Sequence, residues 1–488
     1  MDFFTRIFGK QKKSDANRVS RIFFTNTLSG SKELFVSQKP GIVTMYSCGP
    51  TVYGPAQIGN FRSYIFSDIL ARTLVSAGYR ARRVINITDF GHLISDGDDG
   101  EDKMTKGLRR EGLPLTLANM RIMAEKYASS FIEELAELGV NTEQITFPRA
   151  SDYIQEQIAL IKTLEQKGYA YRTGDGVYFD TSRFPNYGRL GGISVNNQKE
   201  SVRVKMNKEK RNSADFVLWK ADSKLGWESP WGLGFPGWHI ECSTMSRSLL
   251  GQEIDIHTGG EDLAHIHHNN EIAQSEAASG RTFVHYWMHN AFLTMSGGKA
   301  SKSLGNSLYL SDIVEKKFHP LALRYFFLQA HYRTPLSFSW DALAGAAGTL
   351  DRLWKISRDI ADESKRKSAP SLAREHFLAA IRDDLATPQA LGVLWDSLKS
   401  EEYTPEEKWG LIEDADAHLG LSLVNPPTTN ILVEADIPKK IRDLLTCREA
   451  ARTSKNFKEA DRIRGDIENS GYHVDDGPNG PVLNKTTL

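Results

Sequence analysis

The sequence predicts an α/β protein built on a parallel sheet, followed by an all-α helical bundle and a small C-terminal module. Residues 42–46 are apolar and β-branched, which is typical of a buried strand, and a Cys-Gly-Pro turn follows them. Apolar residues then recur at helical spacing over 58–74, and a second strand-like run spans 84–88. A strand, a glycine-containing turn, a helix and a strand form a βαβ unit, so we expect a Rossmann-like sheet.

Beyond this unit the sequence divides into segments of different character. Residues 154–164 carry apolar side chains at helical spacing and residues 177–179 are strand-like, in a stretch that we interpret as an insertion. Strand-like runs at 254–257 and 286–288 return the chain to the sheet, and 350–419 is typical of a bundle. We expect a basic N-terminal tail (1–21), a Rossmann-like domain (22–310) interrupted by an insertion (about 107–230), a connective segment after a lysine-containing loop (311–345), a helical bundle (346–424), a linker (425–436) and a C-terminal module (437–488).

The composition excludes several classes of protein. Lys+Arg and Asp+Glu both number 61, so the overall charge does not favour nucleic acid, although residues 437–471 hold nine basic against six acidic side chains. Three cysteines exclude a disulfide framework and indicate a reducing compartment. No apolar run is long enough to span a membrane, and the basic start lacks the features of a signal peptide, so we expect a cytoplasmic protein. We favour a frayed basic tail over a short amphipathic surface anchor for the first 21 residues.

Four residues could together bind a metal ion. His267 and Glu271 stand four apart in a predicted helix, so their side chains share one face. Cys48 and Cys242 each lie at a turn on the carboxyl side of the predicted sheet, where α/β folds bind ligands. Two thiolates, an imidazole and a carboxylate suit tetrahedral zinc. Spacing alone also fits a solvated helix face and two cysteines that only pack, so it leaves both interpretations open.

Two further segments could bind a nucleotide. The glycine in residues 57–60 (Gln-Ile-Gly-Asn) allows close approach of a ligand, and the helix that starts there offers free amides to an anion. Lys299 and Lys302 lie in a loop rich in serine and glycine, where they could contact phosphates as point charges. Taken singly, such a turn is a common structural device and such a loop is more often an exposed surface feature.

Taken together and in order, these motifs closely resemble the cysteinyl-tRNA synthetase family. The resemblance runs from about Phe23 to the C-terminus. It rests on residues 48–53, 57–60, 86–89, 237–242, 267–271 and 299–306, with 203–205, 215–220 and 383–388 as further matches.

The resemblance implies a zinc ion held by Cys48, Cys242, His267 and Glu271. In this family the thiolate of the substrate cysteine joins the metal, and serine is rejected because it lacks the soft sulfur ligand. The resemblance further implies that the amino acid lies against the residues that match the family's substrate contacts: Cys48, Gly49, Thr88 and Trp238.

The resemblance also implies an ATP site, with Mg²⁺ accompanying the nucleotide. Residues 57–60 correspond to the class I signature His-Ile-Gly-His, which cradles ATP, and Gly259, Gly260 and Asp262 match a segment near the adenosine. Lys299 and Lys302 match the lysines of Lys-Met-Ser-Lys-Ser, which neutralise charge as pyrophosphate leaves. ATP binding is thus assigned to Gln57, Gly59, Asn60, Gly259, Gly260, Asp262 and Lys302, and catalysis to Lys299, Lys302, Gln57 and Asn60.

Three residues depart from the family's signatures. Gln57 replaces the first signature histidine and removes the option of a positive charge, and Asn60 replaces the last. Ala300 replaces the methionine of the lysine loop and removes an apolar anchor.

The function that the resemblance implies is ligation of cysteine, through an ATP-derived cysteinyl adenylate, to the 3′ end of tRNA(Cys), by a monomer with a tRNA-binding C-terminal module. One alternative is a paralogue that ligates activated cysteine to a small amine. Such relatives lack a long anticodon-binding end, whereas 350–488 keeps both a bundle and a basic module. A second alternative, prompted by Gln57 and Ala300, is a catalytically weakened paralogue that binds tRNA or cysteine.

Overall fold

The computed structural model describes residues 21–91, 103–190, 209–295, 298–299, 308–427, 438–477 and 480–485. The expected N-terminal tail lies outside these residues apart from Arg21. Ala300, Lys302 and most of the expected linker also lie outside them.

A five-stranded parallel sheet forms the centre of the fold, in the order β11-β10-β3-β4-β5. Its strands are β3 (Ile42–Ser47), β4 (Arg80–Ile85), β5 (Ile145–Thr146), β10 (Ile254–Gly260) and β11 (Val284–Asn290). The chain proceeds outward in one direction from β3 and in the other from β10, so the order reverses between these two neighbours. Such a switch point is where an open α/β sheet forms a crevice for ligands. The predicted α/β fold with a Rossmann-like sheet and a helical region after it is confirmed.

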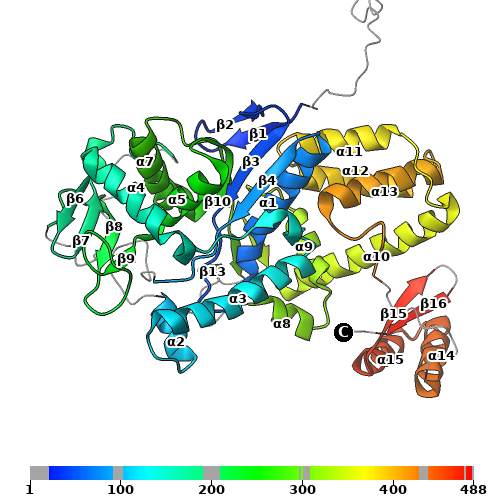
Figure 1. Ribbon diagram of the computed structural model, residues 1–488. Helices are drawn as coiled ribbons and strands as arrows, with labels where there is room; N and C mark the ends of the chain where they lie inside the picture. Colours follow the sequence, from blue (N-terminus) through cyan, green and yellow to red (C-terminus); the bar gives the residue numbers. More distant parts are fainter. Residues whose placement is uncertain are drawn as a thin grey trace, which may run out of the picture.

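Helices cover both faces of the sheet (Figure 1), and the side chains between helices and sheet form two separate cores. α1 (Ile58–Ser76) and α3 (Leu117–Glu137) pack on one face, and α4 (Ile154–Gln166), α5 (Trp238–Leu250) and α7 (His267–Ser279) lie on the other. Successive side chains of a strand point to opposite faces. In β3, therefore, Val43 and Met45 join the α1 core, while Tyr46 joins the α5 core.

The expected insertion of about 107–230 needs correction at its start. β5 pairs in parallel with β4, with Ile145 opposite Arg83, so the chain adds a strand to the main sheet inside this stretch. A separate antiparallel sheet begins only afterwards, in the order β6-β7-β8-β9. Its strands are β6 (Ala170–Thr173), β7 (Gly176–Phe179), β8 (Phe216–Ala221) and β9 (Gly234–Pro236). A strand of two residues has no readable periodicity, which is why the sequence did not reveal β5.

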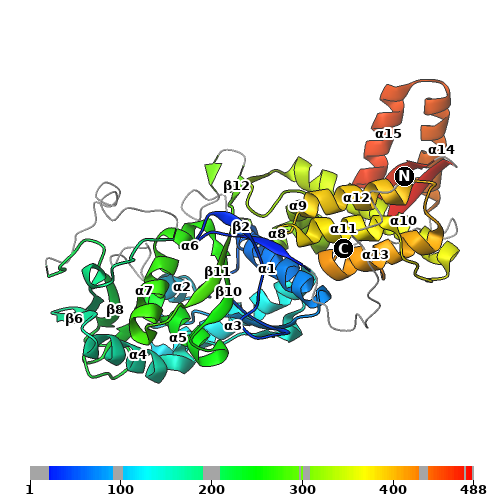
Figure 2. The ribbon, with the colours of Figure 1, turned by 90° about the horizontal axis from the view of Figure 1, so that it is seen from above.

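Helices dominate the chain after the parallel sheet, and they lie on the side of the molecule away from β6 and β8 (Figure 2). They are α8 (Leu310–Glu315), α9 (Pro320–Leu328), α10 (Trp340–Ser364), α11 (Leu372–Arg382), α12 (Thr387–Lys399) and α13 (Pro405–Leu419). The C-terminal module consists of α14 (Lys439–Thr453), α15 (Phe457–Asn469), β15 (Tyr472–Gly477) and β16 (Gly480–Lys485). A small core of its own, which includes Ile441, Ile463 and Ile467, holds α14 and α15 together.

Short elements complete the described fold. They are the hairpin β1 (Phe23–Asn26) and β2 (Ser31–Leu34), the helices α2 (Lys103–Arg110) and α6 (Glu261–His265), the sheet of β12 (Leu293–Met295), β13 (Gly298–Lys299) and β14 (Leu336–Phe338), and the 3₁₀ turns Thr142–Gln144, Ala150–Tyr153 and Thr181–Arg183. Within the described ranges, every helix is too short or too polar to cross a membrane.

A buried cluster of charges joins the sheet domain to the helices that follow it. Asp68 of α1 is fully buried and accepts from Arg324 of α9 at 2.7 Å, from Arg72 at 2.7 Å and from Arg83 of β4 at 3.2 Å. Arg324 also donates to the main-chain oxygen of Leu419, at the end of α13, at 2.6 Å. Three segments distant in sequence are therefore fixed around one carboxylate.

Candidate active site

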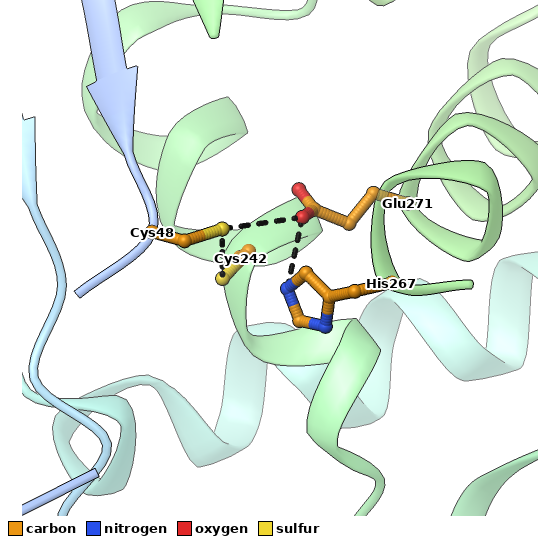
Figure 3. A group of neighbouring side chains, drawn as sticks. All are labelled: Cys48, Cys242, His267 and Glu271. Atoms are coloured by element: carbon orange, nitrogen blue, oxygen red, sulfur yellow. Dashed lines mark hydrogen bonds and ion pairs between the residues drawn. The ribbon is translucent and has the colours of Figure 1, made fainter. Parts of the chain in front are cut away.

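Four potential metal ligands converge at the switch point of the sheet (Figure 3). Cys48 directly follows β3, Cys242 lies on α5, and His267 and Glu271 lie one turn apart on α7. The two Sγ atoms are 4.0 Å apart, Cys48 Sγ lies 3.7 Å from Glu271 Oε1, and His267 Nε2 lies 3.0 Å from the same oxygen. Donors bound to one tetrahedral zinc ion, at about 2.0–2.3 Å each, lie roughly 3.3–3.8 Å from one another. The four residues therefore fit a zinc ion in both chemistry and spacing.

Two histidines that the sequence analysis missed hold these ligands in place. Nδ1 of His239 lies 2.9 Å from Nδ1 of His267, which leaves Nε2 of His267 facing Glu271. Nε2 of His257 contacts Glu271 Oε2 at 3.0 Å, so this carboxylate uses its second oxygen to contact a neighbouring ring. In metal sites, the residues that coordinate the metal are oriented by hydrogen bonds from a second layer of residues to their remaining polar atoms.

A second set of donors shares two members with the first. Cys48 and Glu271 also group with His257 and His268, and Cys48 Sγ lies 3.3 Å from His268 Nε2. The other nitrogen of His268 contacts His289 at 2.7 Å. The first set has two sulfur donors and the second has one, so the first suits soft-ligand zinc chemistry better. Six histidines between residues 257 and 289 are the signal in the sequence that could have revealed this environment.

Burial and the surrounding charges together keep His267 and Cys48 protonated and Glu271 ionised when no metal is bound. Burial would lower the pKa of His267, but its neighbours Cys242 and Glu271 outweigh burial and raise it to about 10. Burial would raise the pKa of Glu271, but His257 and His267 lower it to about 2. Burial, with Cys242 and Glu271, raises the pKa of the Cys48 thiol well above its usual value. A metal ion bound by these residues would have to displace protons from His267 and Cys48, so its affinity would rise with pH.

The residues expected to contact the amino acid surround this cluster. The ring of Trp238 packs on that of His267, with 4.3 Å between ring centroids. Thr88 is buried and donates to Glu241 at 2.6 Å. The backbone nitrogen of Gly49 donates to the side chain of Asn86 at 2.8 Å. A Cβ at Gly49 would lie 1.5 Å from the main-chain oxygen of Asn86, so this position requires glycine.

The residues expected to bind the nucleotide lie mostly at the N-terminus of α1 and at the C-terminal end of β10. Gln57 is the N-cap of α1, and its backbone nitrogen donates to the side-chain oxygen of Asn60 at 3.0 Å. Gly59 leaves room for a Cβ at ordinary contact distance from Leu293, so the protein interior does not demand glycine there. The expectation that this glycine allows close approach of a ligand stays a prediction.

Gly259 and Gly260 end β10, and Asp262 lies in α6 directly after them. A Cβ at Gly259 would lie 2.9 Å from the ring of His268, so this segment, which we expect to border the nucleotide, packs directly against His268. Lys299 lies in β13, opposite Thr294 of β12. Lys302 lies outside the described residues.

A family model described as the catalytic domain of class I (C) tRNA synthetases matches residues 34–348. The chain is 43% identical over 464 residues to cysteine–tRNA ligase 1 of Burkholderia lata, covering 94% of this chain and 96% of that protein. It is 39% identical over 482 residues to the cysteine–tRNA ligase of Treponema denticola, covering 92% and 97%. The chain belongs to the cysteine–tRNA ligase family of class I tRNA synthetases. It is thus a member of an enzyme family of ligases.

A more distant likeness supports the fold alone. The methionyl-tRNA synthetase of Mycobacterium tuberculosis, solved in complex with methionyl-adenylate, superposes with a TM-score of 0.56 at 15% identity. The superposition covers 83% of this chain and 94% of that chain. The shared architecture therefore extends through the sheet domain and into the helices that follow it.

Proposed function

We propose that the chain attaches L-cysteine to tRNA(Cys) in two steps, through a cysteinyl adenylate made from ATP. The observation that carries this proposal is the convergence of Cys48, Cys242, His267 and Glu271 at the switch point. A zinc ion bound there supplies a soft Lewis acid that prefers the thiolate of cysteine to the hydroxyl of serine. Membership of the cysteine–tRNA ligase family supports the same substrate.

The protein's own residues would then position the reactants. Trp238 and Thr88 border the amino acid, and the N-terminus of α1 presents its positive dipole end to the phosphates. Gly259, Gly260 and Asp262 border the adenosine, and Lys299 and Lys302 neutralise charge as pyrophosphate leaves. Such catalysis depends on orientation and electrostatic stabilisation rather than on a covalent intermediate with a side chain.

Cysteine-dependent ATP–pyrophosphate exchange, measured with and without tRNA, tests the proposal. We expect exchange with cysteine in the absence of tRNA, little exchange with serine, and charging of tRNA(Cys) transcripts. Exchange without charging of tRNA would favour the paralogue that uses a small amine. Binding of tRNA(Cys) without exchange would favour the catalytically weakened paralogue.

Substitution of Gln57 by histidine should raise the rate of adenylate formation. A charged hydrogen bond to the phosphates is roughly twice as strong as one from a neutral amide, so the natural residue forgoes about 1–2 kcal/mol, or roughly tenfold in rate. The KM for cysteine should barely change, since cysteine binds at the metal centre. Pre-steady-state adenylation kinetics of Q57H and the unchanged protein measure both quantities. An unchanged or slower rate would show that the family's histidine does not act as a cation here.

Removal of the C-terminal module should weaken tRNA binding without affecting adenylate formation. The module has its own core, and Lys439, Lys440, Arg442, Lys455 and Lys458 are exposed on it, as basic side chains that contact phosphates must be. A chain that ends at Pro427 should bind tRNA(Cys) less tightly, and the logarithm of its affinity should fall less steeply with the logarithm of salt concentration. Filter binding over a series of salt concentrations, with pyrophosphate exchange as the control, checks this. Unchanged tRNA affinity would contradict a role in anticodon binding.

A further inference from the structure

Arg62 is a buried arginine whose hydrogen bonds join the start of α1 to two loops. It lies on α1, two residues after the Gln57–Asn60 signature, and its side chain is almost fully buried. Its Nη1 donates to the main-chain oxygens of Ala291 at 2.8 Å and Phe292 at 2.7 Å. Its Nη2 donates to the main-chain oxygens of His331 at 3.3 Å and Thr334 at 2.5 Å. One planar guanidinium group therefore ties α1 to two separate loops.

Both loops lead directly into the small sheet that carries Lys299. Phe292 immediately precedes β12, and residues 331–334 end one residue before β14, which pairs in parallel with β12. β12 in turn pairs with β13, where Thr294 stands opposite Lys299. Thr294 is only two residues, or about 7 Å along an extended strand, from the contact of Arg62 with Phe292. A short chain of hydrogen-bonded contacts thus connects Arg62, through Phe292 and β12, to Lys299 in β13.

Further contacts connect the same segment to the remaining parts of the site. The backbone nitrogen of Phe292 donates to Glu261 Oε1 at 3.0 Å, and Glu261 lies between Gly260 and Asp262. The backbone nitrogen of Ile58 donates to the main-chain oxygen of Leu308 at 2.9 Å, on the far side of the lysine loop. Arg62 therefore lies where three segments meet. They are residues 57–60, residues 259–262, which we expect near the adenosine, and the small sheet that carries Lys299.

We propose that Arg62 is a positioning residue for ATP: it fixes the strand that bears Lys299 against the N-terminus of α1 and so sets the spacing of the phosphate contacts. This inference rests on the proposed function, because it assumes that ATP binds between these elements. Burial lowers the pKa of Arg62 to about 10, so the group stays charged at neutral pH. Lysine cannot reproduce the fork, because it offers a single nitrogen where the four carbonyls need two.

Arg324 provides a matched control elsewhere in the fold. It is also a fully buried arginine whose pKa burial lowers to about 10, and it also donates to main-chain oxygens, those of Leu138 and Leu419. Its contacts join the sheet domain to α13 rather than to β12. Loss of Arg324 should therefore reduce stability without changing the spacing of the ATP contacts.

The test compares R62K and R62Q with R324K and R324Q in the full-length protein. Steady-state exchange gives kcat and the KM values for ATP and cysteine, and thermal unfolding gives Tm. We expect both Arg62 variants to lose at least about tenfold in kcat/KM for ATP, because small misplacements of reacting groups cost up to roughly 10²-fold. The KM for cysteine should change less than about twofold, which is within the scatter expected for an unaffected site. The Arg324 variants should lower Tm comparably and leave both KM values within the same limit.

A second variant keeps the inference open to contradiction if the Arg62 variants do not fold. Glu261→Ala removes a further contact to Phe292, made from a partly exposed position, and it should also raise the KM for ATP. An unchanged KM for ATP in E261A would overturn the role of Arg62 and leave the proposed function standing. Equal losses of kcat/KM for ATP in R62K and R324K would do the same. Absence of exchange in the unchanged protein would instead refute the proposed function, and this inference with it.

Discussion

Replacement of Cys242 by serine should remove most of the bound zinc and lower cysteine-dependent exchange by roughly 10²–10³-fold. Even partners that merely orient a metal ligand are worth about 10–100-fold in affinity or activity, and Cys242 is a ligand in the proposed set. The thiol is buried and lies 4.0 Å from Cys48 Sγ, so a serine hydroxyl would present a harder donor from the same place. Elemental analysis of the purified protein and the exchange assay measure the two effects.

Cys447→Ser is the matched control for this substitution. Cys447 is exposed on α14, and among the described residues it belongs to neither group of potential metal ligands. Its replacement should change neither the metal content nor exchange. A C242S protein that keeps a full equivalent of zinc and normal exchange would exclude the two-thiolate set, and the set of Cys48, His257, His268 and Glu271 would then become the candidate.

The set of four candidate metal ligands could be predicted from the sequence only through the resemblance. His267 and Glu271 share a helix face, which spacing reveals, but Cys48 and Cys242 lie on other elements and nearly two hundred residues apart. What joins them is the reversal of strand order between β3 and β10, a long-range property that local periodicity does not encode. The contacts of His239 and His257 with these residues were missed for a related reason: the density of histidines between residues 257 and 289 signals such an environment, but it does not show which rings face one another.

Arg62 shows a second limit of sequence periodicity, which does not reveal that a charged residue of a helix is buried. In the helical run of α1 a charged residue is expected on the solvated face, yet Arg62 is 3% exposed. Its burial is possible because the ends of two loops, absent from any local pattern, supply four carbonyl oxygens. The spacing of apolar residues predicted helix α1 correctly. The four hydrogen bonds that bury Arg62 are tertiary contacts, and only the structure shows them.

Replacement of Asp68 by alanine should destabilise the protein by about 3–5 kcal/mol at neutral pH, because it leaves buried guanidinium groups without their partner. Arg324 is fully buried and Arg83 nearly so, and both contact this carboxylate. Denaturant unfolding followed by fluorescence measures the loss. Glu125→Ala is the control: it removes an exposed carboxylate from an ion pair with Arg121 at the same helical spacing as Asp68 and Arg72, and surface pairs of this kind contribute little.

The pH dependence of that loss identifies its cause. Burial would raise the pKa of Asp68, but the charges of Arg324, Arg72 and Arg83 outweigh burial and hold the pKa well below its usual value. A carboxylate whose pKa is lower in the folded state stabilises that state above its unfolded pKa of about 3.9, and this stabilisation disappears as pH falls toward the folded value. The difference in unfolding free energy between the natural protein and D68A should therefore be full at pH 7 and shrink progressively below about pH 4. A difference that stays constant down to acid pH would indicate lost packing rather than lost charge.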